Sequence, residues 1–244
     1  MTRRVLALLA ERRVRGTFFV VGELALAHPD LVRAVAAAGH EIALHGWRHV
    51  PLTDLDAPAF HDDTRRGKAL LEDLSGTEVV GFRAPSFSLV AASSWAADVL
   101  AELGFAYSSS VLPARNPLFG WPGMPRRPFR FASGLLELPV PVTTIGGVTN
   151  AYLGGSYLRV LPPPVVHLGL RRARSDEVLW TYCHPYDFDP DEPFARRPGL
   201  SRAANRLLWV NRARMLRRVA LLLEGRAAEP LATRAATLVD VPSL

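Results

Sequence analysis

The stretch that decides the fold is residues 39–49, which read Gly-His-Glu-Ile-Ala-Leu-His-Gly-Trp-Arg-His. Residues 41–44 predict a short buried strand, and Gly39 in front of them predicts the end of a helix. His45 and His49 follow the strand directly. In folds built of parallel strands and helices, functional side chains collect in the loops after the carboxyl ends of the strands. The stretch therefore predicts both such a fold and a site within it.

The same order of strand, loop and helix repeats along the first half of the chain. Continuously apolar runs predict buried strands, and helical periodicity predicts the helices between them. We expect strands over 16–22, 41–44, 78–82 and 105–109, and helices over 2–12, 29–38, 58–74 and 94–103. This order is typical of parallel βα units. Because it begins with a helix, we expect the first strand of the fold to be missing.

The second half of the chain is less regular. Residues 111–165 are rich in proline and glycine and predict an irregular insertion with one clear strand, 135–140. The apolar run 178–183 predicts the last strand, and 204–225 predicts a C-terminal helix with leucine inside and arginine outside. A chain of 244 residues is expected to form a single domain over 1–244.

Composition and charge exclude several classes of protein. With 49% hydrophobic and 21% charged residues, the chain is neither disordered nor fibrous, and no apolar run is long enough to span a membrane. A single cysteine, Cys183, excludes an internal disulfide framework. The formal charge is +6, and Lys68 is the one lysine among 29 basic residues, but these form no sustained basic block. We expect no nucleic-acid partner and no stable membrane insertion.

His45 and His49 are the first candidate metal ligands. Two imidazoles four residues apart can meet on one helical face or across a tight turn, and this spacing suits a divalent ion such as zinc. The alternative is a pair of surface histidines beside a turn. Their place directly after a buried strand favours the metal site.

Two further polar clusters follow predicted strands. His184 ends the run 178–183, where an imidazole suits a general acid or base or, alternatively, caps the strand. Arg83 precedes Ala84-Pro85 and is held extended, so its guanidinium can orient a carboxylate or form a structural ion pair. Backbone N–H groups of Ser86 and Phe87 are candidates for facing an oxyanion.

Other titratable residues are weaker candidates. Asp187 and Asp189 lie close behind His184 and can bind a metal or shape the loop. We expect the rest to be structural, solvated or inert, namely His28, His40, His61 and Cys183.

Taken together, these clusters resemble the polysaccharide deacetylase family, the NodB-homology carbohydrate esterases. Residues 17–20 resemble the family's second strand, and residues 39–49 resemble its histidine motif. Residues 81–88, Gly-Phe-Arg-Ala-Pro-Ser-Phe-Ser, resemble the arginine motif of the subgroup associated with exopolysaccharide gene clusters, and residues 182–190 resemble the last motif. The resemblance extends over most of the chain.

The resemblance implies a distorted (β/α)7 barrel and a metal-dependent hydrolase that removes acetyl groups from the N-acetylated sugars of a polysaccharide or oligosaccharide. It implies that His45 and His49 bind zinc or another divalent ion, whose water attacks the acetamide carbonyl. His184 would protonate the leaving amine, the backbone near Ser86 would hold the oxyanion, and Arg83 would tether the catalytic aspartate. This hypothesis requires His184 to meet the His45–His49 pair.

The sequence departs from the family in a respect that bears on activity. The family's aspartate motif, which supplies the general base and a third metal ligand, has no counterpart here, and Ser108 stands where relatives often carry an aspartate. The start is assigned too late, or the chain is truncated and inactive, or a carboxylate from Asp187 or a neighbouring subunit substitutes. The retained histidines and Arg83 favour the first explanation.

Two other functions stay open. A non-catalytic, carbohydrate-binding remnant of the same fold would bind glycan without His184 and without metal. An arginine-rich protein that docks on anionic surfaces would bind in a salt-dependent way, whatever the sugar. The apolar run 5–10 is too short for a secretory signal, so a cytoplasmic protein is expected unless a late start hides an export signal.

Overall fold

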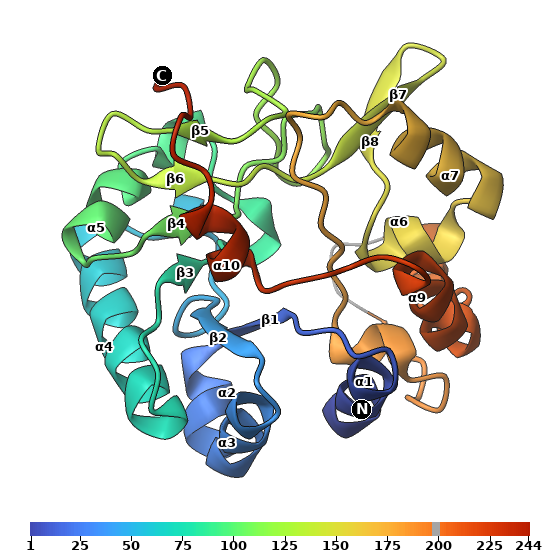
Figure 1. The fold of residues 1–244 in the computed structure, drawn as a ribbon, viewed down its shortest axis with the longest axis horizontal. Coiled ribbons are helices and arrows are strands. Elements are labelled where there is room, and N and C mark those ends of the chain that lie inside the picture. The colour runs from blue at the N-terminus through green and yellow to red at the C-terminus, as the bar shows by residue number, and fades with distance from the viewer. Residues whose placement is uncertain (197–200) are drawn as a thin grey trace. The chain divides into compact units, whose positions relative to one another are not determined.

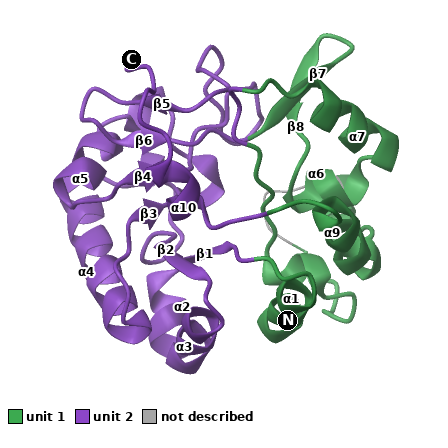
Figure 2. Ribbon diagram, viewed as in Figure 1, with its two compact units in different colours: residues 1–14, 141–175, 179–227 green, residues 15–140, 176–178, 228–244 purple. Residues whose placement is uncertain are grey.

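A computed structural model describes residues 1–196 and 201–244 of the chain. The chain divides into two compact units, coloured green and purple in Figure 2. Unit 1 comprises residues 1–14, 141–175 and 179–227, and unit 2 comprises residues 15–140, 176–178 and 228–244. Each unit is built around its own buried apolar side chains.

Unit 2 contains a six-stranded sheet in the order β1-β2-β3-β4-β6-β5. Its strands are β1 (Thr17–Val20), β2 (Glu41–Leu44), β3 (Gly81–Phe82), β4 (Tyr107–Ser108), β5 (Phe129–Arg130) and β6 (Leu136–Glu137). Strands β1 to β4 and β6 pair in parallel, and β5 pairs with β6 in antiparallel fashion. The predicted alternation of parallel strands and helices is therefore confirmed for this unit.

The helices of unit 2 cover the sheet. They are α2 (Gly22–Ala27), α3 (Pro29–Ala37), α4 (Ala57–Ser75), α5 (Ala96–Glu102) and α10 (Leu231–Ala236). Helices α3 and α4 pack against β2, and Figure 1 shows α2 to α5 along one side of the strands. Asp56 caps α4 by accepting from the Ala59 amide at 2.8 Å, and Gly76 ends it in the left-handed conformation. The prediction missed α2.

Glycine at position 67 lets α4 lie close to β2. A Cβ atom on Gly67 would come within 2.7 Å of the Leu44 side chain, so a larger residue would push the helix away from the strand. Phe60, Thr64 and Leu71 are buried on the same face of α4, at the spacing of a helical stripe. The position of β2, and of the loop that follows it, thus depends on this contact.

The distorted (β/α)7 barrel is not confirmed. Among the described residues the sheet of unit 2 is open, with β1 and β5 at its edges. The run 178–183, predicted as the last strand, makes a single bridge from Tyr182 to Gly154. An apolar run predicts burial, and Trp180 is indeed buried, but a strand also needs an extended neighbour along its length. This run lacks that continuous partner within the described chain.

Unit 1 combines a hairpin with five helices among its described residues. The hairpin is formed by β7 (Val142–Ile145) and β8 (Val148–Ala151), and the helices are α1 (Thr2–Glu11), α6 (Gly155–Val160), α7 (Pro163–Arg172), α8 (Arg202–Leu207) and α9 (Met215–Leu223). Their common core contains Tyr152, Leu158, Val166, Met215 and Val219. Residues 111–165 are therefore more regular than predicted. Gly146 and Gly147, both with positive φ, are the hairpin turn and not part of an irregular loop.

The predicted C-terminal helix over 204–225 is interrupted. Helix α8 ends at Leu207, α9 begins at Met215, and Asn211 between them is left-handed, with φ of 60°. The carbonyls of Leu208 and Val210 accept from the Arg159 guanidinium, at 2.8 and 3.1 Å, instead of from the next helical turn. Leucine periodicity alone does not reveal this break, because the carbonyls there bond to an arginine far away in the sequence.

Candidate functional site

His45 and His49 lie in the loop after β2 and face each other. Their ring centroids are 4.8 Å apart, with the rings edge to face at 78°. The His45 amide donates to the Val20 carbonyl at 2.8 Å, which ties the start of the loop to β1. Gly46 and His49 both have positive φ, 74° and 58°, so the chain turns tightly between the two histidines. This turn brings the two rings together.

The carbonyl of Arg83 orients the His45 ring. It lies 2.7 Å from His45 Nδ1, so this nitrogen carries the proton and the lone pair of the neutral ring is on Nε2. A backbone carbonyl in this position is the usual way to fix a metal-binding histidine. Imidazole nitrogens are ligands that divalent ions such as zinc accept. No group of three histidine, cysteine or acidic side chains suited to a metal occurs among the described residues.

Arg83 is buried at the end of β3. Its Nε donates to the Ser109 carbonyl at 3.1 Å, and its Nη2 donates to the Ser109 hydroxyl at 2.5 Å. The guanidinium also lies over the Phe19 ring, 3.9 Å from its centroid. The next amide, that of Ala84, donates to the Ser110 hydroxyl at 2.8 Å. Two consecutive serines after β4 therefore hold the backbone whose carbonyl orients His45.

Glu137 is a member of this group that sequence reasoning missed. It is fully buried on β6, beside Ser108 of β4 in the parallel register. Its Oε1 accepts from the amides of Ser110 and Val111, at 2.7 and 2.8 Å. Burial raises the pKa of Glu137, against the opposing effect of these amides and of the Arg83 charge. A single acidic residue inside the apolar run 135–140 was the sequence feature that could have indicated its buried role.

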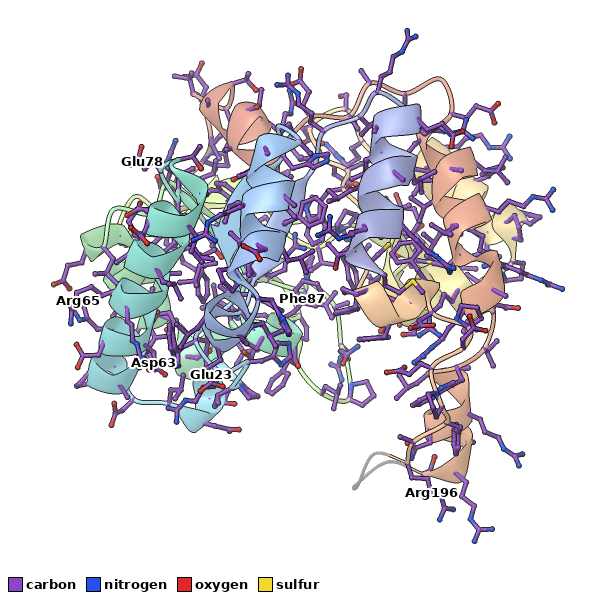
Figure 3. All side chains as sticks on the ribbon, turned by 90° about the horizontal axis from the view of Figure 1, so that it is seen from below. Glu23, Asp63, Arg65, Glu78, Phe87 and Arg196 are labelled. Carbon is purple, nitrogen blue, oxygen red and sulfur yellow. The ribbon has the colours of Figure 1, made fainter. Side chains whose placement is uncertain are left out.

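Ser86 and Phe87 form a strained turn after Arg83. Both residues have φ of 57°, a conformation that non-glycine residues adopt rarely. The Phe87 amide donates to the Ala84 carbonyl at 3.1 Å, so a role for this amide on a substrate requires that bond to open. Figure 3 labels Phe87 among the side chains of unit 2.

A hollow adjoins the histidine loop within unit 2. Its lining is mostly apolar and includes Gly46, Trp47, Phe60, Phe82 and Pro85. Thr64 also lines it, and its buried hydroxyl has no hydrogen-bond partner among the described residues.

His184 belongs to unit 1, where it is paired with Asp187. One carboxylate oxygen of Asp187, Oδ2, lies 3.1 Å from His184 Nδ1 and accepts from the His184 amide at 2.7 Å. The other oxygen forms an ion pair with Arg159 Nε at 2.8 Å, outside hydrogen-bond angle. Asp187 and Arg159 are buried, whereas the His184 side chain is 38% exposed and stacks on Tyr186.

The charge of Asp187 is stabilised in this arrangement. Burial alone would raise the pKa of Asp187, but the hydrogen bonds from His184 and the charge of Arg159 outweigh it and lower the pKa. The carboxylate therefore stays ionised and keeps the proton of His184 on Nδ1. Burial, with the Asp187 charge, raises the pKa of Cys183, which makes this thiol unreactive.

The other singled-out histidines have structural surroundings. His40 is buried against Phe18, and its Nδ1 accepts from the Gly16 amide at 3.2 Å. Burial and the charge of Arg15 lower the pKa of His40. His61 lies on α4 within ion-pair distance of Asp62 and Glu102.

Comparisons with known proteins relate the two parts of the chain to two family models. The model described as "Polysaccharide deacetylase" matches residues 1–108, and "Domain of unknown function (DUF3473)" matches residues 109–231. A chitooligosaccharide deacetylase from Rhizobium leguminosarum bv. trifolii is 47% identical over 64 residues, which are 26% of this chain. The match spans only 30% of that relative's length.

Solved structures that resemble the chain over nearly its full length include the following two. A protein from Mycobacterium smegmatis that is classed as a polysaccharide deacetylase is 26% identical, with a TM-score of 0.63, and the match covers 100% of this chain and 79% of the other. A CE4 family pseudoenzyme from Bacillus anthracis matches 96% of this chain and 60% of its own, with a TM-score of 0.51. At 12% identity, this second likeness shows the fold alone.

Proposed function

Because the chain belongs to the polysaccharide deacetylase family over residues 1–108, and to the DUF3473 family over 109–231, we propose that it is a metal-dependent deacetylase of N-acetylated saccharides. Deacetylases of this family are hydrolases of the amide bond between an acetyl group and a sugar amine. The observation that carries the proposal is the facing pair His45 and His49, with the His45 ring oriented by the Arg83 carbonyl. We further propose that the open sheet is part of the family's distorted (β/α)7 barrel.

In this proposal His45 and His49 hold a divalent metal ion, zinc in the first instance. Such an ion, when bound, polarises a carbonyl and makes a bound water acidic. The Arg83 carbonyl keeps Nε2 of His45 as the ligand atom by holding the proton on Nδ1. A catalytic zinc site takes three protein ligands, so one more than this pair is required.

His184 is the proposed proton donor. The carboxylate of Asp187 holds the proton on His184 Nδ1, which leaves Nε2 to take up a proton and deliver it to the leaving amine. The partly exposed ring is accessible for this transfer, while buried Arg159 keeps Asp187 ionised. The backbone at Ser86 is proposed to face the oxyanion, and Arg83 to tether a catalytic aspartate.

A second candidate function is carbohydrate binding without catalysis. It is favoured by the lack of a third metal-suited side chain beside His45 and His49 within the described residues. In that case glycan binding requires neither a metal ion nor His184. The substrate in both cases is an N-acetylated polysaccharide or oligosaccharide.

Zinc binding by the chain tests the metal site directly. His45→Gln and His49→Gln should each lower zinc affinity by tenfold or more, measured by competition with a chelating dye. His61→Gln is the matched control, because His61 lies on α4, within ion-pair distance of Asp62 and Glu102. Equal zinc affinity in all three variants would remove the metal site from the proposal.

Acetate release from N-acetylglucosamine oligosaccharides, with zinc added, tests the reaction. His184→Ala should abolish acetate release but leave zinc affinity unchanged. Glycan binding that persists in His184→Ala and after chelation, without any acetate release from the unaltered chain, would instead establish the binding function.

A further inference from the structure

The positive charge of the chain is concentrated in one unit. Unit 1 carries 17 arginines against six carboxylates, a formal charge of +11, whereas unit 2 carries 12 basic and 17 acidic residues, a charge of −5. The arginines look scattered along the sequence because unit 1 is assembled from three separate segments. A field of this sign favours anionic partners.

The segment from α8 to α9 is the most uniformly basic part of unit 1. The chain has no aspartate or glutamate between Glu192 and Glu224, and this segment lies within that interval. Four of its arginines are exposed, and none of them forms an ion pair with a described residue, namely Arg202, Arg206, Arg214 and Arg217. Two others serve the fold, since Arg212 pairs with Glu192 and Arg218 donates to the Leu158 and Leu161 carbonyls. Figure 3 shows nitrogen-tipped side chains projecting around Arg196, just before this segment.

Large apolar side chains are exposed among these arginines. Leu207 is 44% exposed, Val210 41% and Leu221 56%. Arg214, which precedes α9 as its N-cap, has the i, i+3, i+7 spacing of one helical face with Arg217 and Leu221, and Met215 and Val219 on the other face are buried in the core of unit 1. The solvent face of α9 is thus both basic and aliphatic.

We propose that the 202–221 surface, formed by the exposed arginines and by Leu207, Val210 and Leu221, binds anionic lipid headgroups and rests on a membrane surface. Arginines match the charge of the headgroups, and partly exposed aliphatic side chains enter the boundary between headgroups and acyl chains. A soluble polyanion, such as an acidic polysaccharide, would match the charge but gives no reason for exposed leucine and valine. Among the described residues, no helix has the length and apolar character that crossing a membrane requires.

The expected strength follows from the number of basic residues near the lipid. Each arginine close to an anionic surface contributes about fivefold to partitioning, so loss of all four lowers binding by a factor on the order of hundreds. Because the attraction is electrostatic, added salt should weaken it steeply.

Co-flotation of the full chain with vesicles tests this proposal. The probes are vesicles of phosphatidylcholine alone and of phosphatidylcholine mixed with phosphatidylglycerol, at low and high salt. The quadruple variant R202Q/R206Q/R214Q/R217Q should lose binding to the anionic vesicles. The matched control removes the same charge from exposed arginines of unit 2, as R33Q/R65Q/R115Q/R234Q, and should keep it.

The apolar half of the proposal has its own pair of variants. L207S/L221S should weaken vesicle binding, whereas L24S/L26S, which alters two leucines of α2 that are each 58% exposed, should not. Circular dichroism of each variant confirms that it is folded. Three results would overturn the proposal: no flotation with anionic vesicles, equal losses in the two quadruple variants, or binding to an acidic polysaccharide that exceeds vesicle binding and ignores L207S/L221S.

Discussion

Replacing Glu137 by leucine should destabilise the chain strongly, while replacement by glutamine should not. Oε1 of Glu137 accepts from the buried amides of Ser110 and Val111, at 2.7 and 2.8 Å. Leucine leaves both amides without this acceptor, and an unsatisfied buried donor costs about 1–3 kcal/mol, so the loss is about 2–6 kcal/mol. Glutamine keeps a carbonyl oxygen as acceptor and removes the buried charge, so its effect is within about 1 kcal/mol.

The same substitution should also affect the proposed metal site. Glu137 holds the backbone at Ser110. Ser110 and its neighbour Ser109 accept hydrogen bonds from the Ala84 amide and from the Arg83 side chain. The Arg83 carbonyl in turn orients His45. Glu137→Leu should therefore lower zinc affinity as well as stability, whereas Glu137→Gln should preserve both.

Urea unfolding at several pH values measures the stability part. Since the pKa of Glu137 is raised in the folded chain, the folded state holds a proton that the unfolded state has released, over the range just above the ordinary glutamate value of 4.5. This contribution to the free energy of unfolding therefore grows as pH falls toward that value, and Glu137→Gln should abolish it. Equal urea midpoints for the leucine and glutamine variants, or equal pH slopes for the unaltered chain and Glu137→Gln, would refute the reasoning.

Two further substitutions test unit 1. Asp187→Asn leaves the charge of buried Arg159 without its partner and should cost about 3–5 kcal/mol in urea unfolding at neutral pH. Because the pKa of Asp187 is lowered, its stabilising effect is present above the ordinary aspartate value of 3.8 and is lost as pH falls through the folded value, a loss the variant should lack. Gly154→Ala places a Cβ atom 2.5 Å from the Tyr182 carbonyl oxygen and should lower the free energy of unfolding by about 1–3 kcal/mol. The control is Gly16→Ala, whose Cβ atom would have nothing within 4 Å, and it should lower the free energy of unfolding by less than about 1 kcal/mol in the same urea experiment.

The first half of the fold was predictable because its strands contain short apolar runs. Residues 18–21 and 42–44 are apolar throughout, and glycines mark the ends of neighbouring helices, so both elements could be placed from local pattern. His45 and His49 could also be predicted as a pair from local pattern. A strand that ends at Leu44 puts the residues after it in the loop at the carboxyl end of the strands.

The second half was less predictable because distant residues decide it. The helix break at Asn211 depends on carbonyls that bond to Arg159, some fifty positions earlier in the chain. Glu137 was missed for a similar reason, because its importance comes from the amides after β4 and not from its own neighbours. Polar contacts over long sequence separations leave no periodic signal.

Backbone strain supports the site in unit 2 without any appeal to resemblance. Five described residues other than glycine have positive φ, namely Arg13, His49, Ser86, Phe87 and Asn211. Three of the five lie in the two loops that follow β2 and β3, next to His45 and Arg83. Each such residue costs of order 1–3 kcal/mol and persists only where its surroundings fix it. A pure scaffold gains nothing from strain gathered in the loops at one end of a sheet, whereas a site that must hold two imidazoles edge to face does. The buried supports at Ser109, Ser110 and Glu137 are what keep that strained edge in place.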